Sequence, residues 1–76
     1  MSTIAAVNTR NQFRGKVVGV KRSPVVSEVE IETGAGIVSA IVTSSSLEVL
    51  DLKLGDPVIA LFKATEVLIA AVSSHD

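Results

Sequence analysis

Three groups of polar residues in this 76-residue sequence have the chemistry to hold a small anion. Residues 8–11 precede the first predicted strand, residues 43–46 precede a predicted helix, and Lys63 follows an apolar strand. An oxyanion is bound by hydroxyl donors, backbone N–H groups and one or two cations. Each group also has an ordinary explanation, because serines before a helix usually cap it and a lone lysine at a strand end is usually solvated.

The sequence contains few residues that are suited to catalysis. The one histidine, His75, lies one residue from the C-terminus, and there is no cysteine, which excludes a Cys/His zinc site. Glu28, Glu30 and Glu32 could resemble a metal cluster, but acids at alternating strand positions are typical of a solvated face. We therefore predict that the protein is not an enzyme, has no cofactor, and coordinates no metal directly through side chains.

The composition predicts assembly. Hydrophobic residues make up 47% of the chain, whereas a domain this short buries only about 60% of the surface of its unfolded chain. Surplus apolar surface usually marks an interface, so we predict a homo-oligomer. A net charge of −1 and only two aromatic residues argue against single-stranded nucleic acid as the partner.

Nothing in the sequence predicts a membrane segment. No stretch approaches the roughly 20 apolar residues that span a bilayer, and the N-terminal residues have no basic region typical of a secretory signal. We therefore predict a cytoplasmic protein with no membrane partner.

The hydrophobic pattern predicts an all-β fold, a five-stranded OB-type barrel with one short helix between strands 3 and 4. The second strand alternates, with Val25, Ser27, Val29 and Ile31 on one face and the glutamates on the other. Ser45 and Glu48 have capping-box spacing, which predicts the helix. The predicted strands cover residues 12–20, 25–32, 37–42, 58–62 and 67–72. We predict one domain over residues 1–76, with a core of about residues 8–72.

The last two predicted strands are apolar on both faces. The outer face of an antiparallel sheet is usually polar. Residues 58–62 and 67–72 therefore predict that something covers the outside of the barrel, and another copy of the chain is the simplest cover.

At these same residues the sequence resembles the molbindins. Residues 8–17 (NTRNQFRGKV) resemble the opening signature of that family, Ser-Ala-Arg-Asn-Gln followed by two variable residues and Gly. Residues 41–46 (IVTSSS) resemble its Thr followed three residues later by Ser, and residues 54–63 resemble its Leu-Gly, strand and lysine. The resemblance runs from about residue 8 to residue 71, in the right order and spacing.

The resemblance implies an OB-type barrel that binds molybdate or tungstate in the cytoplasm. It also implies dimers that exchange strands and assemble into a hexamer, a trimer of dimers, with the oxyanion at subunit interfaces. Similar domains occur in molybdate-responsive regulators and on transporter ATPases. Without such segments here, the resemblance implies storage or buffering in molybdenum homeostasis. The alternative is a non-catalytic OB-fold module that interacts with nucleic acid or protein.

The resemblance also implies a set of oxyanion-binding residues. Arg10 matches the signature arginine, and Asn8 replaces the usual serine with an amide that can still donate. The hydroxyl pair of a neighbouring subunit and the lysine with its following backbone N–H complete the set. The implied residues are Asn8, Arg10, Thr43, Ser46, Lys63 and Ala64. Molybdate is a dianion that accepts hydrogen bonds, and this set provides donors without carboxylates.

Overall fold

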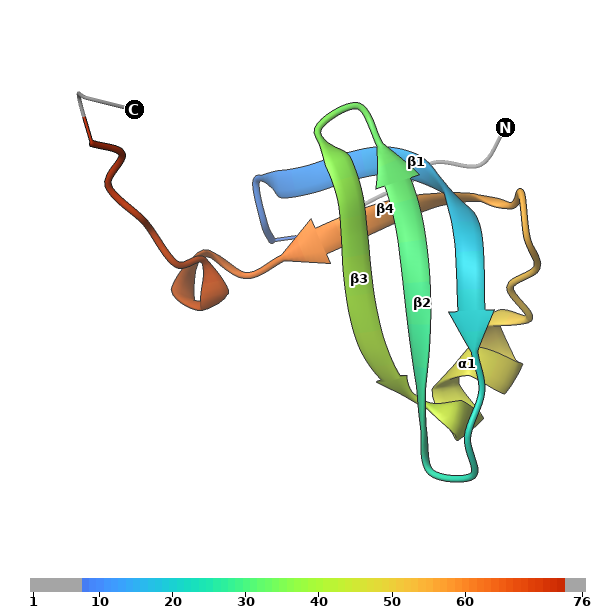
Figure 1. Cartoon of the computed structure of the whole chain (residues 1–76). Helices are drawn as coiled ribbons and strands as arrows, with labels where there is room; N and C mark the ends of the chain where they lie inside the picture. The colour runs from blue at the N-terminus through green and yellow to red at the C-terminus, as the bar shows by residue number, and fades with distance from the viewer. Residues whose placement is uncertain (1–7, 74–76) are drawn as a thin grey trace.

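Within the residues that the computed structural model describes, 8–73, four strands form one antiparallel sheet in the order β3-β2-β1-β4. The elements are β1 (Asn11–Lys21), β2 (Val26–Thr33), β3 (Gly36–Thr43), the helix α1 (Ser44–Leu50), β4 (Pro57–Phe62) and the 3-10 helix η1 (Ala64–Glu66). The sheet is strongly curved, and the chain after η1 projects away from it (Figure 1). The first four predicted strands and the helix between strands 3 and 4 are therefore confirmed.

Glycines let the first two strands approach and bend. A Cβ at Gly15 would lie 2.2 Å from the backbone oxygen of Glu32, so no other residue allows β1 and β2 to come this close. The pairing of β1 with β2 shifts register between Val17 and Gly19, an irregularity that a glycine inside a strand permits. A hairpin turn joins β2 to β3, and Gly36 has φ +118° at its end.

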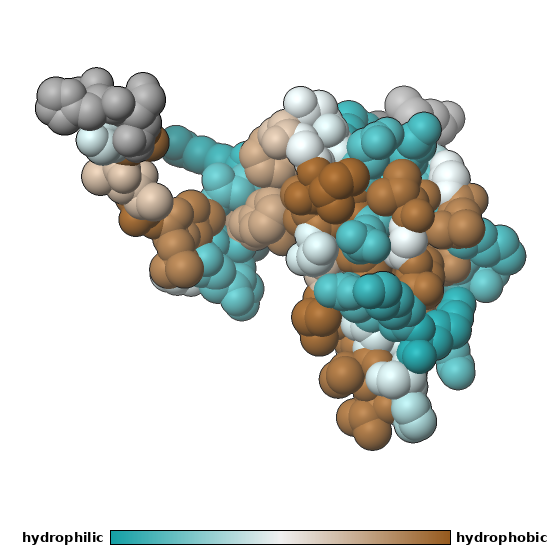
Figure 2. Space-filling model, viewed as in Figure 1, coloured by the Kyte–Doolittle hydropathy of each residue, from teal (hydrophilic) through white to brown (hydrophobic). Residues whose placement is uncertain are grey.

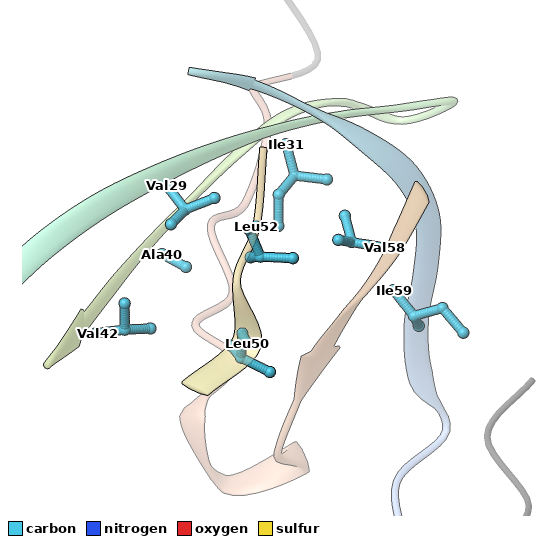
Figure 3. Close-up of a pocket in the computed structure, with 8 residues that line it drawn as sticks. All are labelled: Val29, Ile31, Ala40, Val42, Leu50, Leu52, Val58 and Ile59. Carbon is cyan, nitrogen blue, oxygen red and sulfur yellow. The ribbon is translucent and has the colours of Figure 1, made fainter. Parts of the chain in front are cut away.

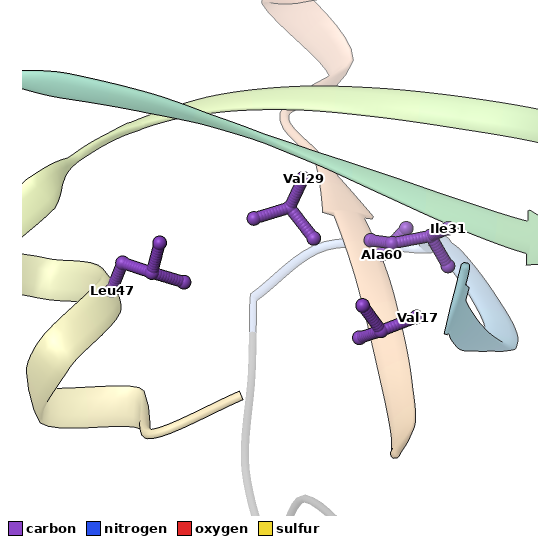
Figure 4. Close-up of a cluster of buried hydrophobic side chains, with 5 residues drawn as sticks. All are labelled: Val17, Val29, Ile31, Leu47 and Ala60. Atoms are coloured by element: carbon purple, nitrogen blue, oxygen red, sulfur yellow. The ribbon is translucent and has the colours of Figure 1, made fainter. Parts of the chain in front are cut away.

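The core lies inside the curved sheet, beneath α1. Its five buried apolar side chains come from β1, β2, α1 and β4 (Figure 4). They are Val17, Val29, Ile31, Leu47 and Ala60. Leu47 has no exposed surface, and α1 packs on β2 and β3. The helix therefore closes one end of the curved sheet.

The outer face of β2 is charged, as the alternation predicts. Glu32 lies 3.8 Å from the Nζ of Lys16, and Glu28 lies 3.9 Å from that of Lys21, so both glutamates pair with β1. The described part of the chain contains no group of three histidine, aspartate or glutamate residues that could hold a metal ion. Nor does any helix in this part have the length and apolarity to cross a membrane.

The helix begins at a different cap from the one predicted. Thr43, not Ser45, is the N-cap, and its Oγ1 accepts a hydrogen bond from the Ser46 backbone N at 3.2 Å. The four consecutive residues 43–46 can all cap a helix, so local sequence does not choose among them. A contact with the loop before β2 decides which of these residues is the N-cap. The Ser44 backbone N, directly after Thr43, donates to the Val25 carbonyl oxygen at 2.9 Å.

The fifth predicted strand differs from the structure. Residues 67–72 form no strand within this chain, and Leu68 and Ile69 are each 94% exposed. A strand needs a neighbour to pair its backbone groups, and η1 directs this segment away from the sheet of its own chain (Figure 1). We call residues 67–72 the arm; Figure 2 shows hydrophobic residues on its surface, clear of the body.

Candidate oxyanion-binding site

One part of the predicted site lies where β1 begins and β4 ends. Asn11, the first residue of β1, pairs with Phe62, the last residue of β4. Arg10 and Lys63 therefore lie at the same end of two neighbouring strands. We call Asn8, Arg10, Lys63 and the backbone N–H of Ala64 the charged half of the site, and the side chains of its three polar residues are exposed.

This end of the molecule has positive charge that is not neutralised by an ion pair. The ion pairs within residues 8–73 involve Lys16, Lys21 and Lys53, so neither Arg10 nor Lys63 takes part in one. Two exposed cations at neighbouring strand ends attract an anion from solution. The histidine of the sequence lies outside the described residues.

The other part consists of Thr43 and Ser46, which we call the hydroxyl half. Thr43 Oγ1 donates to Ser46 Oγ at 2.7 Å, and it accepts from the Ser46 backbone N at 3.2 Å and from Ser45 Oγ at 3.4 Å. A hydroxyl has one proton, and that of Thr43 is directed at Ser46. The proton of Ser46 is therefore the one available to a ligand.

A buried serine supports the hydroxyl half from below. Ser27 on β2 is 3% exposed, and its Oγ lies 2.7 Å from the Oγ of Ser44, the first residue of α1. Ser44 Oγ in turn donates to the Ser23 carbonyl oxygen at 2.5 Å. These bonds attach the start of the helix to β2 and its preceding loop. Sequence analysis missed this role, although a serine at an inward position of an apolar strand was a signal.

A single chain does not bring the two halves together. Lys21, the last residue of β1, pairs with Glu28 of β2. Thr43 pairs with Val26, which lies beyond Glu28 at this same end of the sheet. Arg10, in contrast, precedes the opposite end of β1. Since β1 has 11 residues and a strand rises about 3.3 Å per residue, the halves are separated by roughly 30 Å along the curved strand. Figure 1 shows α1 and the exit of β4 at different ends of the sheet.

Inside the curved sheet, residues between positions 29 and 59 of the described chain line an apolar pocket that does not suit an oxyanion. A pocket of about 280 Å³ opens between β3 and β4, and its wall is entirely aliphatic (Figure 3). It is lined by Val29, Ile31, Ala40, Val42, Leu50, Leu52, Val58 and Ile59. Without polar side chains, this pocket cannot replace the hydration of a dianion.

Known proteins are similar to this chain in sequence and in fold. Residues 8–69 match the TOBE domain. Molybdenum-pterin-binding protein 3 of Clostridium pasteurianum is 40% identical over 67 residues, which are 87% of this chain and 98% of that protein. The solved structure of MopII from Clostridium pasteurianum is similar with a TM-score of 0.81 and 39% identity, over 87% of this chain and 100% of that one. A molybdate binding protein from Sporomusa ovata is similar with a TM-score of 0.82 and 29% identity, over 87% and 98% of the two chains.

The fold and the matched residues thus define a TOBE-domain protein with an OB-type barrel. Among TOBE-domain proteins, the chain belongs to the molbindin (Mop) family.

Proposed function

We propose that this protein binds molybdate or tungstate at sites shared between two subunits of a homo-oligomer. The observation that carries the proposal is the separation, within one chain, of the charged half from the hydroxyl half. Arg10 and Lys63 lie at one end of the sheet, and Thr43 and Ser46 lie near the other. Both halves present donors on exposed residues, so the charged half of one subunit can face the hydroxyl half of another. The similarity to a molybdenum-pterin-binding protein and to a molybdate binding protein supports the choice of anion.

The arm is a second feature that supports the proposed homo-oligomer. In the order β3-β2-β1-β4 both β3 and β4 are edge strands, and unpaired edges accept a further strand. A hollow of about 410 Å³ runs between these edges and includes Ile41 and Leu61. We propose that the arm of a second copy enters this space as the fifth strand. Its apolar side chains, among them Leu68 and Ile69, would then leave water, and a hexamer built from such dimers would cover more of the apolar surface.

The donor set suits a large tetrahedral dianion. Each charge-assisted bond from Arg10 or Lys63 contributes about 1.5–3 kcal/mol, and the hydroxyl half adds the neutral donor of Ser46. Sulfate has the same charge but is smaller, so donors fixed around molybdate would be too distant from its oxygens. We therefore expect sulfate to bind much more weakly than molybdate or tungstate, which isothermal titration calorimetry would measure.

We propose storage or buffering of the oxyanion in the cytoplasm as the cellular role, with no catalytic step. The chain spans 98% of the length of the molybdenum-pterin-binding protein that it matches. That extensive similarity supports a binding role for this chain.

The test is to mix two variants that each lose one half of the site. Lys63→Ala removes a cation from the charged half, and Ser46→Ala removes the available hydroxyl from the hydroxyl half. Each variant alone should bind molybdate poorly. After the two are unfolded and refolded together, some interfaces should combine an intact charged half with an intact hydroxyl half and recover binding.

Two controls make the outcome decisive. Lys63→Ala refolded alone should recover nothing, and native mass spectrometry should show mixed oligomers in the sample with both variants. If mixed oligomers form but no molybdate binds, the site does not combine residues of two subunits and the proposal is wrong.

A further inference from the structure

Thr9 lies between two residues of the charged half, and its hydroxyl is fully used within the protein. Its Oγ1 donates to the carbonyl oxygen of Phe62, 53 residues away in the sequence. The same oxygen accepts a hydrogen bond from the Asn11 backbone N at 3.2 Å. Thr9 therefore ties residues 8–11 to the end of β4, directly before Lys63.

Gln12 holds the same segment from the other side. Its Nε2 donates to the Thr9 carbonyl oxygen at 2.7 Å, and its backbone N donates to the Arg10 carbonyl oxygen at 3.1 Å. The backbone around Arg10 is thus fixed on both sides, although the guanidinium itself is on an exposed residue.

We infer that Thr9 is a positioning residue, which holds Asn8 and Arg10 beside Lys63 so that the charged half can close on an anion. The inference rests on the proposed function. The one hydroxyl proton of Thr9 goes to the Phe62 oxygen, so Thr9 is not itself a donor to the ligand. The molbindin signature has alanine at this position, which cannot make this bond, so the tie belongs to this chain rather than to the signature.

The positive charges of Arg10 and Lys63 explain why the Thr9 hydrogen bond would favour anion binding. Arg10 and Lys63 carry the same charge and repel each other until an anion lies between them. A segment free to move would separate these charges in the unliganded protein, and binding would then have to order it. A hydrogen bond that keeps the segment at β4 before the anion arrives removes part of that cost.

The chain contains a matched control for this threonine. In the β2–β3 turn, Thr33 Oγ1 donates to the Gly36 carbonyl oxygen at 2.8 Å and accepts from the Ala35 backbone N at 3.1 Å. Thr33 thus makes the same pair of bonds as Thr9, in a turn that contains no residue of the predicted site. Valine keeps the shape of threonine and removes the hydroxyl at either position.

The experiment compares Thr9→Val, Thr9→Ser and Thr33→Val by calorimetric titration of the intact oligomer with molybdate. Thr9→Val should weaken binding roughly threefold to tenfold, the loss expected for one neutral hydrogen bond. Thr9→Ser should restore most of the affinity, and Thr33→Val should leave it unchanged. In an Arg10→Ala background, Thr9→Val should have less effect, because the group that it positions is gone.

A second measurement needs no ligand. The ¹⁵N relaxation of the Arg10 amide should show increased motion in Thr9→Val but not in Thr33→Val. Wild-type affinity in Thr9→Val, or the same loss with and without Arg10, would overturn the inference while leaving the proposed function intact. A wild-type protein that binds no molybdate would instead overturn the proposed function, and the positioning role for an anion with it.

Discussion

The two halves of the candidate site differ in how completely one chain builds them. In the hydroxyl half, Thr43 and Ser46 bond to each other at the start of α1, and the bond between Ser27 and Ser44 holds this end of the helix to β2. In the charged half, only the backbone is tied, through Thr9. The side chains that would carry its positive charge are on exposed residues.

This difference follows from the chemistry of the groups. Neutral hydroxyls satisfy one another, so they can be ordered before any ligand arrives. Two cations cannot satisfy each other, and they gain a partner only when an anion or another subunit is present. The hydroxyl half is therefore a preformed surface, whereas we propose that assembly and ligand complete the charged half.

The largest expected effect comes from the arm, next to the charged half. Leu68→Asp with Ile69→Asp would place two carboxylates where the proposed assembly buries apolar side chains, and burying unpaired charge is strongly unfavourable. We expect loss of the oligomer and of molybdate binding together. Sedimentation velocity should then show a species near the 7.9 kDa of one chain.

The control is Ala35→Asp, which adds a carboxylate at an exposed turn between β2 and β3. It should leave the oligomer intact. An arm variant that still sediments like the wild type would show that assembly does not depend on the arm. The proposal that assembly through the arm completes the charged half would then be wrong.

The arm also shows how far sequence alone can predict the fold. The alternation in β2 and the apolar runs of the other strands were sufficient to predict four strands, because these patterns are local to the chain. The run of apolar residues 67–72 predicts a buried strand equally well. Its pattern contains no information on which chain supplies the neighbouring strand, so the barrel was predicted within one chain and the described structure lacks its fifth strand.

The site was predictable to a similar degree. The donor types at Arg10, Thr43 and Lys63 could be recognised, partly through the family resemblance, but their use as ligands remains a prediction. The helix cap was placed two residues too late, because the choice among residues 43–46 depends on the tertiary bond from Ser44 to Val25. Thr9 was missed because its partner Phe62 is 53 residues away.

The next effect tests how firmly the hydroxyl half is supported. Leu47→Ala would leave a cavity under α1, since this side chain has no exposed surface, and should lower the free energy of unfolding by about 2–5 kcal/mol. Val49→Ala on the same helix is the control, because Val49 is 85% exposed and should cost less than about 0.5 kcal/mol. Urea denaturation at fixed protein concentration measures both, and equal costs would contradict the assigned core.

A smaller effect separates charge from hydroxyl in binding. Lys63→Ala should weaken molybdate binding by about 1.5–3 kcal/mol, roughly tenfold to a hundredfold, because a charge-assisted bond to a dianion is lost. Thr43→Val should cost less in affinity, because it removes a neutral hydroxyl. Lys53→Ala is the control, since Lys53 pairs with Asp51 at 3.3 Å and belongs to neither half. If Thr43→Val proves the more damaging of the two in calorimetry, the assignment of roles is reversed.

The smallest expected effect concerns the serines beneath the hydroxyl half. Because Ser44 Oγ donates to the Ser23 oxygen, it must accept from Ser27. Ser44→Ala leaves the buried Ser27 hydroxyl without its partner and should lower the free energy of unfolding by about 1–2 kcal/mol. Ser27→Ala removes the buried group itself and leaves Ser44 bonded to Ser23, so it should cost less. Ser39→Ala, on an exposed residue of β3, is the control.

The double variant of Ser27 and Ser44 makes this comparison sharper. With both hydroxyls absent, no buried donor is left unpaired, so the double variant should be no less stable than Ser44→Ala alone. Denaturant midpoints at fixed protein concentration give all the required differences. Strictly additive costs would mean that the two serines act independently, and the start of α1 would then not be held to β2 by this bond. A non-additive result would support ordering of the hydroxyl half by side-chain contacts within a single chain, whereas in the charged half such contacts order only the backbone.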